Sequence, residues 1–479
     1  MAQSKVAGGV MWSAVERFAT LGIQFVLNII IARILSPSDY GLIGMLAIFL
    51  QISQCLIDSG FSNALIQKKN RGETDYGTVF TFNLVLSVLL YGILFVCAPL
   101  IARFYRIELL CRVLRIVGLN LVITSLSIVQ KTILTIKLDF KTQSVISVAG
   151  ALVSGGVGIF LAFKGAGVWA LVAQTLTTGL LTTVLYWLLP GNRFRVCFDT
   201  ASFRQLGSFG VKLMFSSLLN TAYNNLYALF IGKRYSAEDL GFYSRADQFS
   251  SLPSSTLTDV ITRVSYPVLC EKQDDRAALS QSYTRFIRLS CYIVFPIMIV
   301  LAALSKPLIV TLLTDKWLPA ALLLSLLALD GLFAPVNRIN LCLLQAVGRS
   351  DLFLRLEIIK KALAIGILLA MLRFGIVWVC LGRLFYSVLA LLINMYYTVG
   401  IVNKSYWAQI KDWLPLMLLS AICGGAALLP GLVLAGSLAQ LLAGGALAVV
   451  LYLLLSRLLG IEEYKVCRRF ALSKLPHKK

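Results

Sequence analysis

The chain has 479 residues, of which 58% are hydrophobic and only 14% are charged. Soluble domains contain about 25% charged residues, so this composition excludes a soluble globular protein. The 44 Lys and Arg residues outnumber the 22 Asp and Glu residues. In a soluble protein this excess would indicate nucleic-acid binding, but in a membrane protein basic loops orient the helices, and we expect no nucleic-acid partner.

Apolar stretches long enough to cross a ~30 Å hydrocarbon core follow one another along the chain. We predict an all-α integral membrane protein of about 14 transmembrane helices. The helices are expected near residues 10–34, 42–65, 78–102, 109–131, 143–164, 167–189, 208–231, 241–268, 283–305, 318–345, 352–373, 376–400, 413–433 and 437–459. The expected domains are an N-terminal six-helix lobe (1–195), a C-terminal six-helix lobe (196–404), two extra helices (405–460) and a basic cytoplasmic tail (461–479).

An internal repeat links the two lobes. The segment Ile31–Gly41 (IARILSPSDYG) returns 200 positions later as Ile231–Gly241 (IGKRYSAEDLG), and Ile, Ser, Asp and Gly coincide at the same spacing. A duplicated helix bundle is typical of secondary transporters, in which the substrate lies between the copies. Because Ser, Pro, Asp and Gly are turn residues, we interpret the motif itself as a structural turn rather than a substrate site.

Basic residues are more numerous on the loops that an inward N-terminus places inside, which predicts that both termini are cytoplasmic. The ten cysteines are scattered without metal-ligand or disulfide spacing, and there is a single His. The chain also lacks the phosphate-binding loop of ATPases. We therefore expect no metal and no cofactor, and we do not expect an enzyme.

Two helices carry polar residues at helical spacing along one face. In the first helix these are Ser13, Arg17, Thr20, Gln24 and Asn28, with Glu16 beside them. In the helix that begins the second repeat they are Lys212, Ser216, Asn220, Asn224 and Tyr227. Polar residues in a membrane are costly and usually face a cavity. The two faces are therefore interpreted as walls of one central cavity; the alternative is hydrogen bonding that only joins helices.

Further ionisable residues lie within predicted helices. Asp259 and Arg263 lie one turn apart and could instead pair with each other, and Arg288 could instead extend to the lipid headgroups. The candidate substrate-cavity residues are Arg17, Gln24, Asn28, Asp58, Lys212, Asn220, Asn224, Arg263, Arg288 and Arg338. With Arg383 added, the bases outnumber the acids, which favours an anionic substrate such as a diphosphate.

Several segments resemble one known family. They are Ala32–Gly41 (ARILSPSDYG), Asp58–Gln67 (DSGFSNALIQ), Leu138–Lys141 (LDFK), Ile231–Lys233 (IGK) and Leu240–Ala246 (LGFYSRA). They resemble the polysaccharide-transport branch of the multidrug/oligosaccharidyl-lipid/polysaccharide exporter superfamily, and the resemblance is closest to Wzx-type flippases of the colanic-acid exporter type. It runs from the N-terminus to about residue 400, so the last two helices lie outside it.

This resemblance implies a MATE-like fold of two lobes related by a parallel pseudo-two-fold repeat, which opens alternately to either side. It implies transport of undecaprenyl-diphosphate-linked repeat units across the bacterial inner membrane for O-antigen, capsule or exopolysaccharide assembly. The expected partners are the lipid-linked oligosaccharide, membrane lipids, and a polysaccharide polymerase with its chain-length machinery. Coupling to protons or sodium is expected to involve Glu16, Asp58 or Asp330.

Two other functions compete with this interpretation. A multidrug/cation antiporter of the same superfamily would be expected to have an acid-rich cavity, because its substrates are cations. A membrane enzyme such as a polysaccharide polymerase or ligase would need a long outer loop, and no predicted loop is long enough. The sequence therefore favours a flippase.

Overall fold

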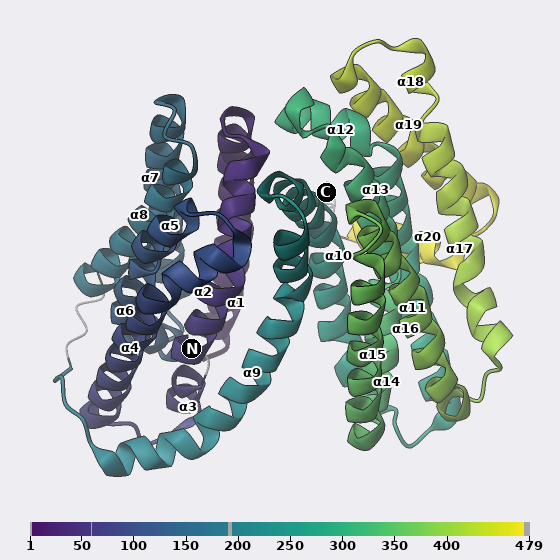
Figure 1. Ribbon diagram of the computed structural model, residues 1–479. Coiled ribbons are helices and arrows are strands. Elements are labelled where there is room, and N and C mark those ends of the chain that lie inside the picture. Colours follow the sequence, from purple (N-terminus) through teal and green to yellow (C-terminus); the bar gives the residue numbers. More distant parts are fainter. Residues whose placement is uncertain (1, 59, 190–193, 474–479) are drawn as a thin grey trace, which may run out of the picture. The chain divides into compact units, whose positions relative to one another are not determined.

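The computed structural model describes residues 2–58, 60–189 and 194–473 (Figure 1), and for residues 2–11, 13–18, 209 and 470–473 it describes only the backbone. Throughout these ranges the regular structure is helical and contains no strand, which confirms the predicted all-α fold. The end of the predicted tail, residues 474–479, lies outside the described residues.

The helices of the first half are α1 (Ala2–Ile34), α2 (Pro37–Asp58), α3 (Phe61–Gln67), α4 (Glu73–Tyr105), α5 (Leu109–Val117), α6 (Leu119–Ile136), α7 (Phe140–Phe163), α8 (Val168–Leu188) and α9 (Thr200–Arg234). Those that follow are α10 (Ala237–Glu271), α11 (Arg276–Ala303), α12 (Ser305–Leu313), the 3₁₀ helix η1 (Asp315–Trp317), α13 (Pro319–Gly331), α14 (Ala334–Ala346), α15 (Ser350–Met371), α16 (Ile376–Val402), α17 (Tyr406–Ala427), α18 (Pro430–Val433), α19 (Ser437–Leu458) and α20 (Glu462–Ser473).

Ten segments of the described chain are long and apolar enough to cross a membrane, so the chain is a multi-pass membrane protein. The predicted spans in α1, α9, α10 and α15 are not among the ten. In α1 the apolar part, Ala19–Ile34, is shorter than a full span. The other three carry many polar residues, such as Asn220 and Asn224 in α9 and Arg355 and Lys360 in α15, which lower their hydropathy. The count of fourteen membrane helices therefore stays a prediction.

The chain divides into two compact units, residues 1–241 and residues 242–479. In the first unit, α7 packs between α1 and α8, α6 packs against α4 and α8, and α2 packs against α9. Its apolar core includes Phe61 and Leu65 of α3, Val79 of α4 and Val129 of α6. Small residues on α7 allow close packing: Gly155 faces Leu27 of α1 so closely that a Cβ atom there would lie 2.3 Å from the leucine side chain.

In the second unit, α11 is central and packs against α13, α14 and α17, while α17 also packs against α19. Phe295 and Met298 of α11 are fully buried in an extended apolar core of this unit. The Tyr452 hydroxyl of α19 donates a hydrogen bond to the main-chain oxygen of Tyr292 at 2.8 Å. The two C-terminal helices that followed the predicted lobe are therefore packed into the second unit through apolar and polar contacts.

The two copies of the repeated motif form the same helix N-terminus. The Ser36 hydroxyl donates to the Asp39 carboxylate at 2.6 Å, and the Ser236 hydroxyl donates to Asp239 at 2.7 Å. In return, each serine oxygen accepts the main-chain N–H of its aspartate. This arrangement satisfies helix N–H groups that otherwise lack partners, so the interpretation of the motif as structural is supported. The helices begin earlier than the predicted residues 42 and 241, because the motif is their first turn.

The glycines that end the two motifs lie where the two helix starts cross. A Cβ atom on Gly41 would lie 1.6 Å from the main-chain oxygen of Ala237, and one on Gly241 would lie 1.9 Å from that of Pro37. Pro37 and Ala237 occupy matching positions of the repeat. Each copy therefore places its glycine against the main chain of the other copy, at a distance that leaves no room for a side chain.

Candidate functional site

One small pocket in the second unit brings together two arginines that the sequence singled out. Arg263 of α10 and Arg338 of α14 both line a cavity of about 260 Å³. The other lining residues are Thr262, Tyr266, Pro267, Leu341, Cys342, Gln345 and Phe353. Both arginines are exposed to this space rather than buried in the core. The pocket therefore combines two cations with hydroxyl and amide groups and one apolar wall.

Prolines shape both helices at this pocket. Pro335 lies in the first turn of α14, one turn before Arg338, where the missing N–H of proline costs nothing. Pro267 lies inside α10 and cannot donate to the carbonyl four residues earlier, which belongs to Arg263. The Arg263 carbonyl therefore lacks its usual helical N–H donor, and it lies next to the side chains that line the pocket. Backbone that departs from regular helix is typical of membrane segments that border a cavity.

The pocket is suited to a phosphate-bearing group. Each guanidinium has five N–H donors in a planar fork that matches two phosphate oxygens. Charge-assisted hydrogen bonds of this kind are stronger than those between neutral groups. A cationic substrate would be repelled, since none of the residues lining this described pocket is acidic.

A charged network in the second unit joins α10, α13 and α16. Arg383 of α16 donates from Nε to Asp330 of α13 at 2.9 Å and from Nη1 to Asp247 of α10 at 2.7 Å. The same Nη1 donates to the Tyr243 hydroxyl at 2.7 Å, and the Ser387 hydroxyl donates to the second oxygen of Asp330. Asp330 is 8% exposed. Both of its oxygens have partners, so any ion that binds there must compete with Arg383 and Ser387.

The sequence singled out Asp330 and Arg383 but did not predict that they pair with each other or that Arg383 also pairs with Asp247. Residue spacing could have indicated this polar network. Tyr243 and Asp247 are four residues apart on α10 and share a helix face. The same spacing relates Arg383 and Ser387 on α16. No local pattern pairs Arg383 with Asp330, because 53 positions separate them. Coupling of transport to an ion at Asp330 stays a prediction.

The first unit holds a neutral polar cluster beside Asp58. The Gln54 side chain donates to the Asp58 carboxylate at 2.8 Å, and the Thr124 hydroxyl donates to Gln54 at 3.4 Å. One turn away, Asn225 of α9 donates to Gln51 at 2.9 Å. The buried amide on α9 is therefore Asn225, whereas the predicted cavity residue Asn224 is exposed.

The remaining predicted site residues occupy several places. Lys212 and Asn220 are exposed on α9, Gln24 is exposed on α1, and Asn28 of α1 is half-buried. Arg17 and Glu16 lie outside the residues whose side chains are described. Arg288 does not line the Arg263–Arg338 pocket; it lines a separate cavity of the same unit and pairs with Glu463. The assignment of these residues to one substrate cavity stays a prediction.

Comparison with known proteins gives the family. Residues 30–322, more than half of the chain, match the family described as "Polysaccharide biosynthesis protein". Lipopolysaccharide biosynthesis protein WzxC of Escherichia coli (strain K12) is 25% identical over 447 residues, which cover 91% of this chain and 90% of WzxC.

Solved structures give the fold. Lipid II flippase MurJ in an inward closed conformation has a TM-score of 0.72 at 16% identity, covering 94% of this chain and 99% of MurJ. An inward-facing multidrug resistance MATE family transporter of the MOP superfamily has a TM-score of 0.62 at 14% identity, covering 81% of this chain and 99% of that one. The predicted MATE-like fold is confirmed. The chain belongs to the polysaccharide biosynthesis protein family of multi-pass membrane proteins.

Proposed function

We propose that this protein is a flippase that moves lipid-linked oligosaccharide repeat units across the bacterial inner membrane for the assembly of a surface polysaccharide. The family match and WzxC, named for polysaccharide and lipopolysaccharide biosynthesis, support the pathway. The fold shared with MurJ supports a flippase. The carrier in this proposal is undecaprenyl diphosphate, and a polysaccharide polymerase with its chain-length machinery would use the product on the other side.

The observation that carries the proposal is the convergence of Arg263 and Arg338 on one pocket without an acidic lining residue. A sugar diphosphate that crosses hydrocarbon loses hydrogen bonds to water, and each unsatisfied polar group costs several kcal/mol. Two arginines that donate hydrogen bonds to the diphosphate replace those lost to water and balance its charge. In this proposal the sugars would cross in a hydrophilic cavity while the polyprenyl tail stays in lipid.

In the proposed orientation, this pocket lies near the cytoplasmic leaflet, where the substrate would first bind. With a cytoplasmic N-terminus and successive spans of alternate direction, α10 and α14 both run toward the cytoplasm. Arg263 lies in the last third of α10, and residues 347–349, which follow α14, form a cytoplasmic connection. The diphosphate would therefore be captured near the cytoplasmic leaflet, and alternating access would release it on the opposite side. Coupling of this cycle to protons or sodium, through Glu16, Asp58 or Asp330, is part of the proposal.

The competing function, a multidrug or cation antiporter, receives less support from this pocket. A cation would be repelled by Arg263 and Arg338, and the acids of the second-unit network are already bonded to Arg383.

The test replaces both arginines in a strain that lacks the chromosomal copy of the gene. Arg263→Gln and Arg338→Gln are each expected to slow translocation of lipid-linked repeat units at least about tenfold, because each removes charge-assisted hydrogen bonds worth about 1.5–3 kcal/mol. The measurement is the accessibility of labelled lipid-linked repeat units on each face of membrane vesicles, together with the amount of surface polysaccharide. Arg373→Gln, an exposed arginine between α15 and α16, is the matched control and should transport normally.

Insertion of each variant at wild-type level is checked first. Normal translocation by both pocket variants would refute the role of the pocket. Normal surface polysaccharide in the gene deletion, with changed sensitivity to cationic drugs, would refute the flippase and favour the antiporter.

A further inference from the structure

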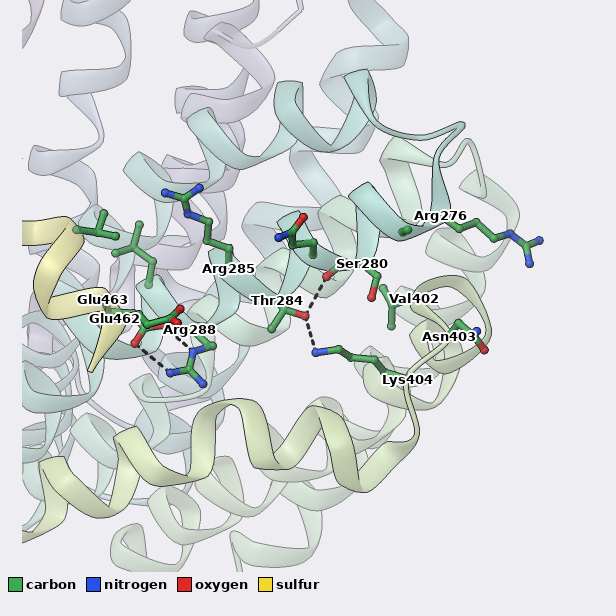
Figure 2. Close-up of a pocket in the computed structure, with 14 residues that line it drawn as sticks. Arg276, Ser280, Thr284, Arg285, Arg288, Val402, Asn403, Lys404, Glu462 and Glu463 are labelled. Carbon is green, nitrogen blue, oxygen red and sulfur yellow. Dashed lines mark hydrogen bonds and ion pairs between the residues drawn. The ribbon is translucent and has the colours of Figure 1, made fainter. Parts of the chain in front are cut away.

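A second, larger cavity lies at one end of the second unit. Its volume is about 880 Å³, and its walls come from the first four turns of α11, the end of α16 at Val402, the connection Asn403–Lys404 and the first turns of α20. Figure 2 shows these residues around one open space. The cavity lies at a membrane face, because the apolar spans of α11 and α16 begin and end there.

Four cations line this cavity against two acids. The cations are Arg276, Arg285, Arg288 and Lys404, and the acids are Glu462 and Glu463. Arg288 and Lys404 extend toward the shared space from opposite sides of Thr284, whereas Arg276 and Arg285 extend away from it (Figure 2). Among the described residues, neither Arg276 nor Arg285 has a hydrogen-bond or ion-pair partner. The cavity therefore carries uncompensated positive charge.

The two central cations have partners but keep free donors. Arg288 donates from Nε and Nη2 to the two oxygens of Glu463, at 2.6 Å and 3.1 Å. Lys404 donates to the Thr284 hydroxyl and to Asp412, both at 2.7 Å. A guanidinium has five N–H donors and an ammonium has three. Three donors of Arg288 and one of Lys404 therefore remain for a ligand between them.

Glu463 fixes Arg288 rather than neutralising the site as a whole. Burial raises the pKa of Glu463, but the hydrogen bond from Arg288, a main-chain hydrogen bond and the positive charge of Arg288 together outweigh burial, so the pKa of this carboxyl lies below its usual value. The carboxylate is therefore ionised at neutral pH and holds Arg288 in place. The carboxylate comes from the first turn of α20, so this helix is one wall of the site.

The shape and the lining fit an amphiphile better than a free ion. Leu289, Val402 and Val466 place apolar surface beside the cations, and a single phosphate would fill only a small part of 880 Å³. Tyr464 and Cys467 of α20 pack on the second-unit core, and the helix also carries the basic residues Lys465 and Arg468. Basic pockets between membrane helices and short basic amphipathic helices are two features that recognise anionic lipid headgroups.

We propose that this cavity binds the phosphate of an anionic membrane phospholipid, with Arg288 and Lys404 as its donors and α20 as one of its walls. The site is separate from the Arg263–Arg338 pocket, and the proposal does not depend on what the protein transports. Arg276 and Arg285, which also line the cavity, raise the positive potential near the site.

The test measures lipid binding to the purified full-length chain in a neutral detergent. Native mass spectrometry and thermal unfolding are followed during titration with phosphatidylglycerol, phosphatidylcholine or inorganic phosphate. Phosphatidylglycerol should bind more tightly than phosphatidylcholine by at least about tenfold, since each nearby Lys or Arg contributes about 1 kcal/mol. Inorganic phosphate at the same concentration should give no comparable shift in melting temperature.

The variants keep the structural contacts intact. Ser280→Asp places a carboxylate in the cavity, at a side chain that makes no contact described above, and should remove the preference for phosphatidylglycerol. Arg285→Gln should weaken phosphatidylglycerol binding about fivefold. Arg355→Gln, an exposed arginine near the start of α15, is the matched control and should bind like the wild type.

Equal binding of the two phospholipids to the wild type would overturn the proposal. So would an undiminished preference in Ser280→Asp with the fold intact, because the added charge faces the proposed phosphate. Stabilisation by inorganic phosphate equal to that by phosphatidylglycerol would overturn the assignment to a lipid.

Discussion

The two units share a helical plan but differ in the groups that they place inside it. In the first unit, contacts between distant helices use mainly amides and hydroxyls, such as Asn225 with Gln51 and Ser87 with Ser125 at 2.9 Å. In the second unit, Arg383 joins two carboxylates from two other helices. The helix starts at Ser36 and Ser236 are nevertheless alike. The repeat has therefore preserved the ends of helices while the interior chemistry of the units became different.

This difference has energetic consequences. A buried ion pair contributes little net stability, yet removal of one partner leaves a charge without compensation, which is costly. The loss of a hydrogen bond between neutral groups in a membrane costs less than the loss of one partner of a buried ion pair, because the neutral groups that are left find other hydrogen-bond partners. We therefore expect the second unit to be far more sensitive to single polar substitutions than the first.

The largest effect is expected from Arg383→Ala. The change leaves Asp330 buried without its cation and should lower the free energy of unfolding by about 3–5 kcal/mol. Thermal unfolding of the purified protein in detergent measures it. The double variant Arg383→Gln with Asp330→Asn should recover much of the loss, because the buried carboxylate is neutralised as well and only the more exposed Asp247 keeps its charge. A single variant as stable as the wild type would show that the network is not a buried pair in solution.

The next effect is expected at the crossing of the repeated motifs. Gly41→Ala places a methyl group 1.6 Å from a main-chain oxygen, which no rotamer can relieve. Separation of the two helices should cost about 1–3 kcal/mol or more, as overpacking does. Gly92→Ala is the matched control in α4, where no atom outside the helix lies within 4 Å. The control should be neutral or stabilising by up to about 1 kcal/mol, and equal melting temperatures of the two variants would contradict this account.

Matching serine substitutions at the two helix starts should have equal effects. Ser36→Ala and Ser236→Ala each remove a cap that accepts the main-chain N–H of the aspartate, at 3.3 Å and 3.0 Å. Each should lower stability by about 1 kcal/mol. The two shifts in melting temperature should be similar, because the two caps are equivalent. A loss confined to one copy would mean that the helix ends have also become different.

The smallest effect is expected from Asn225→Leu in the first unit. The change removes the hydrogen bond to Gln51. Since Gln51 is exposed, its carbonyl can accept from another donor, and the loss should be about 0.6 kcal/mol. The same unfolding assay tests it, with Arg383→Ala as the internal reference. A loss as large as that of Arg383→Ala would remove the distinction between the units.

The membrane class, the order of the helices and the repeat follow from the sequence because they depend on local composition and periodicity. The start of α9 was predicted at residue 208, but Asp199 caps the helix at Thr200 by accepting the Ser202 N–H at 2.8 Å. The stretch near 109–131 divides at Gly118 into α5 and α6, and the stretch near 318–345 divides between Gly331 and Ala334. Hydropathy does not report such breaks, since each stretch as a whole is apolar enough to be read as one membrane span.

The candidate site was less predictable because its contacts join distant parts of the chain. The sequence singled out Arg263 and Arg338, but only the packing of α10 and α14 shows that they share a pocket. Arg288 was predicted to face a substrate, yet its partner Glu463 lies 175 positions later in a segment that was predicted only as a basic tail. Periodicity describes the face of one helix and does not identify its neighbours.

The reciprocal glycine contact also bears on the history of the chain. Gly41 and Gly241 each meet the main chain of the other copy rather than a side chain. After a gene duplication, a contact between side chains can be rebuilt by compensating substitutions, whereas a contact with the main chain accepts no substitute for glycine. Selection on this crossing would therefore act on both copies at once. This explains why the motif is still recognisable in both copies, although the interior residues of the two units have become very different.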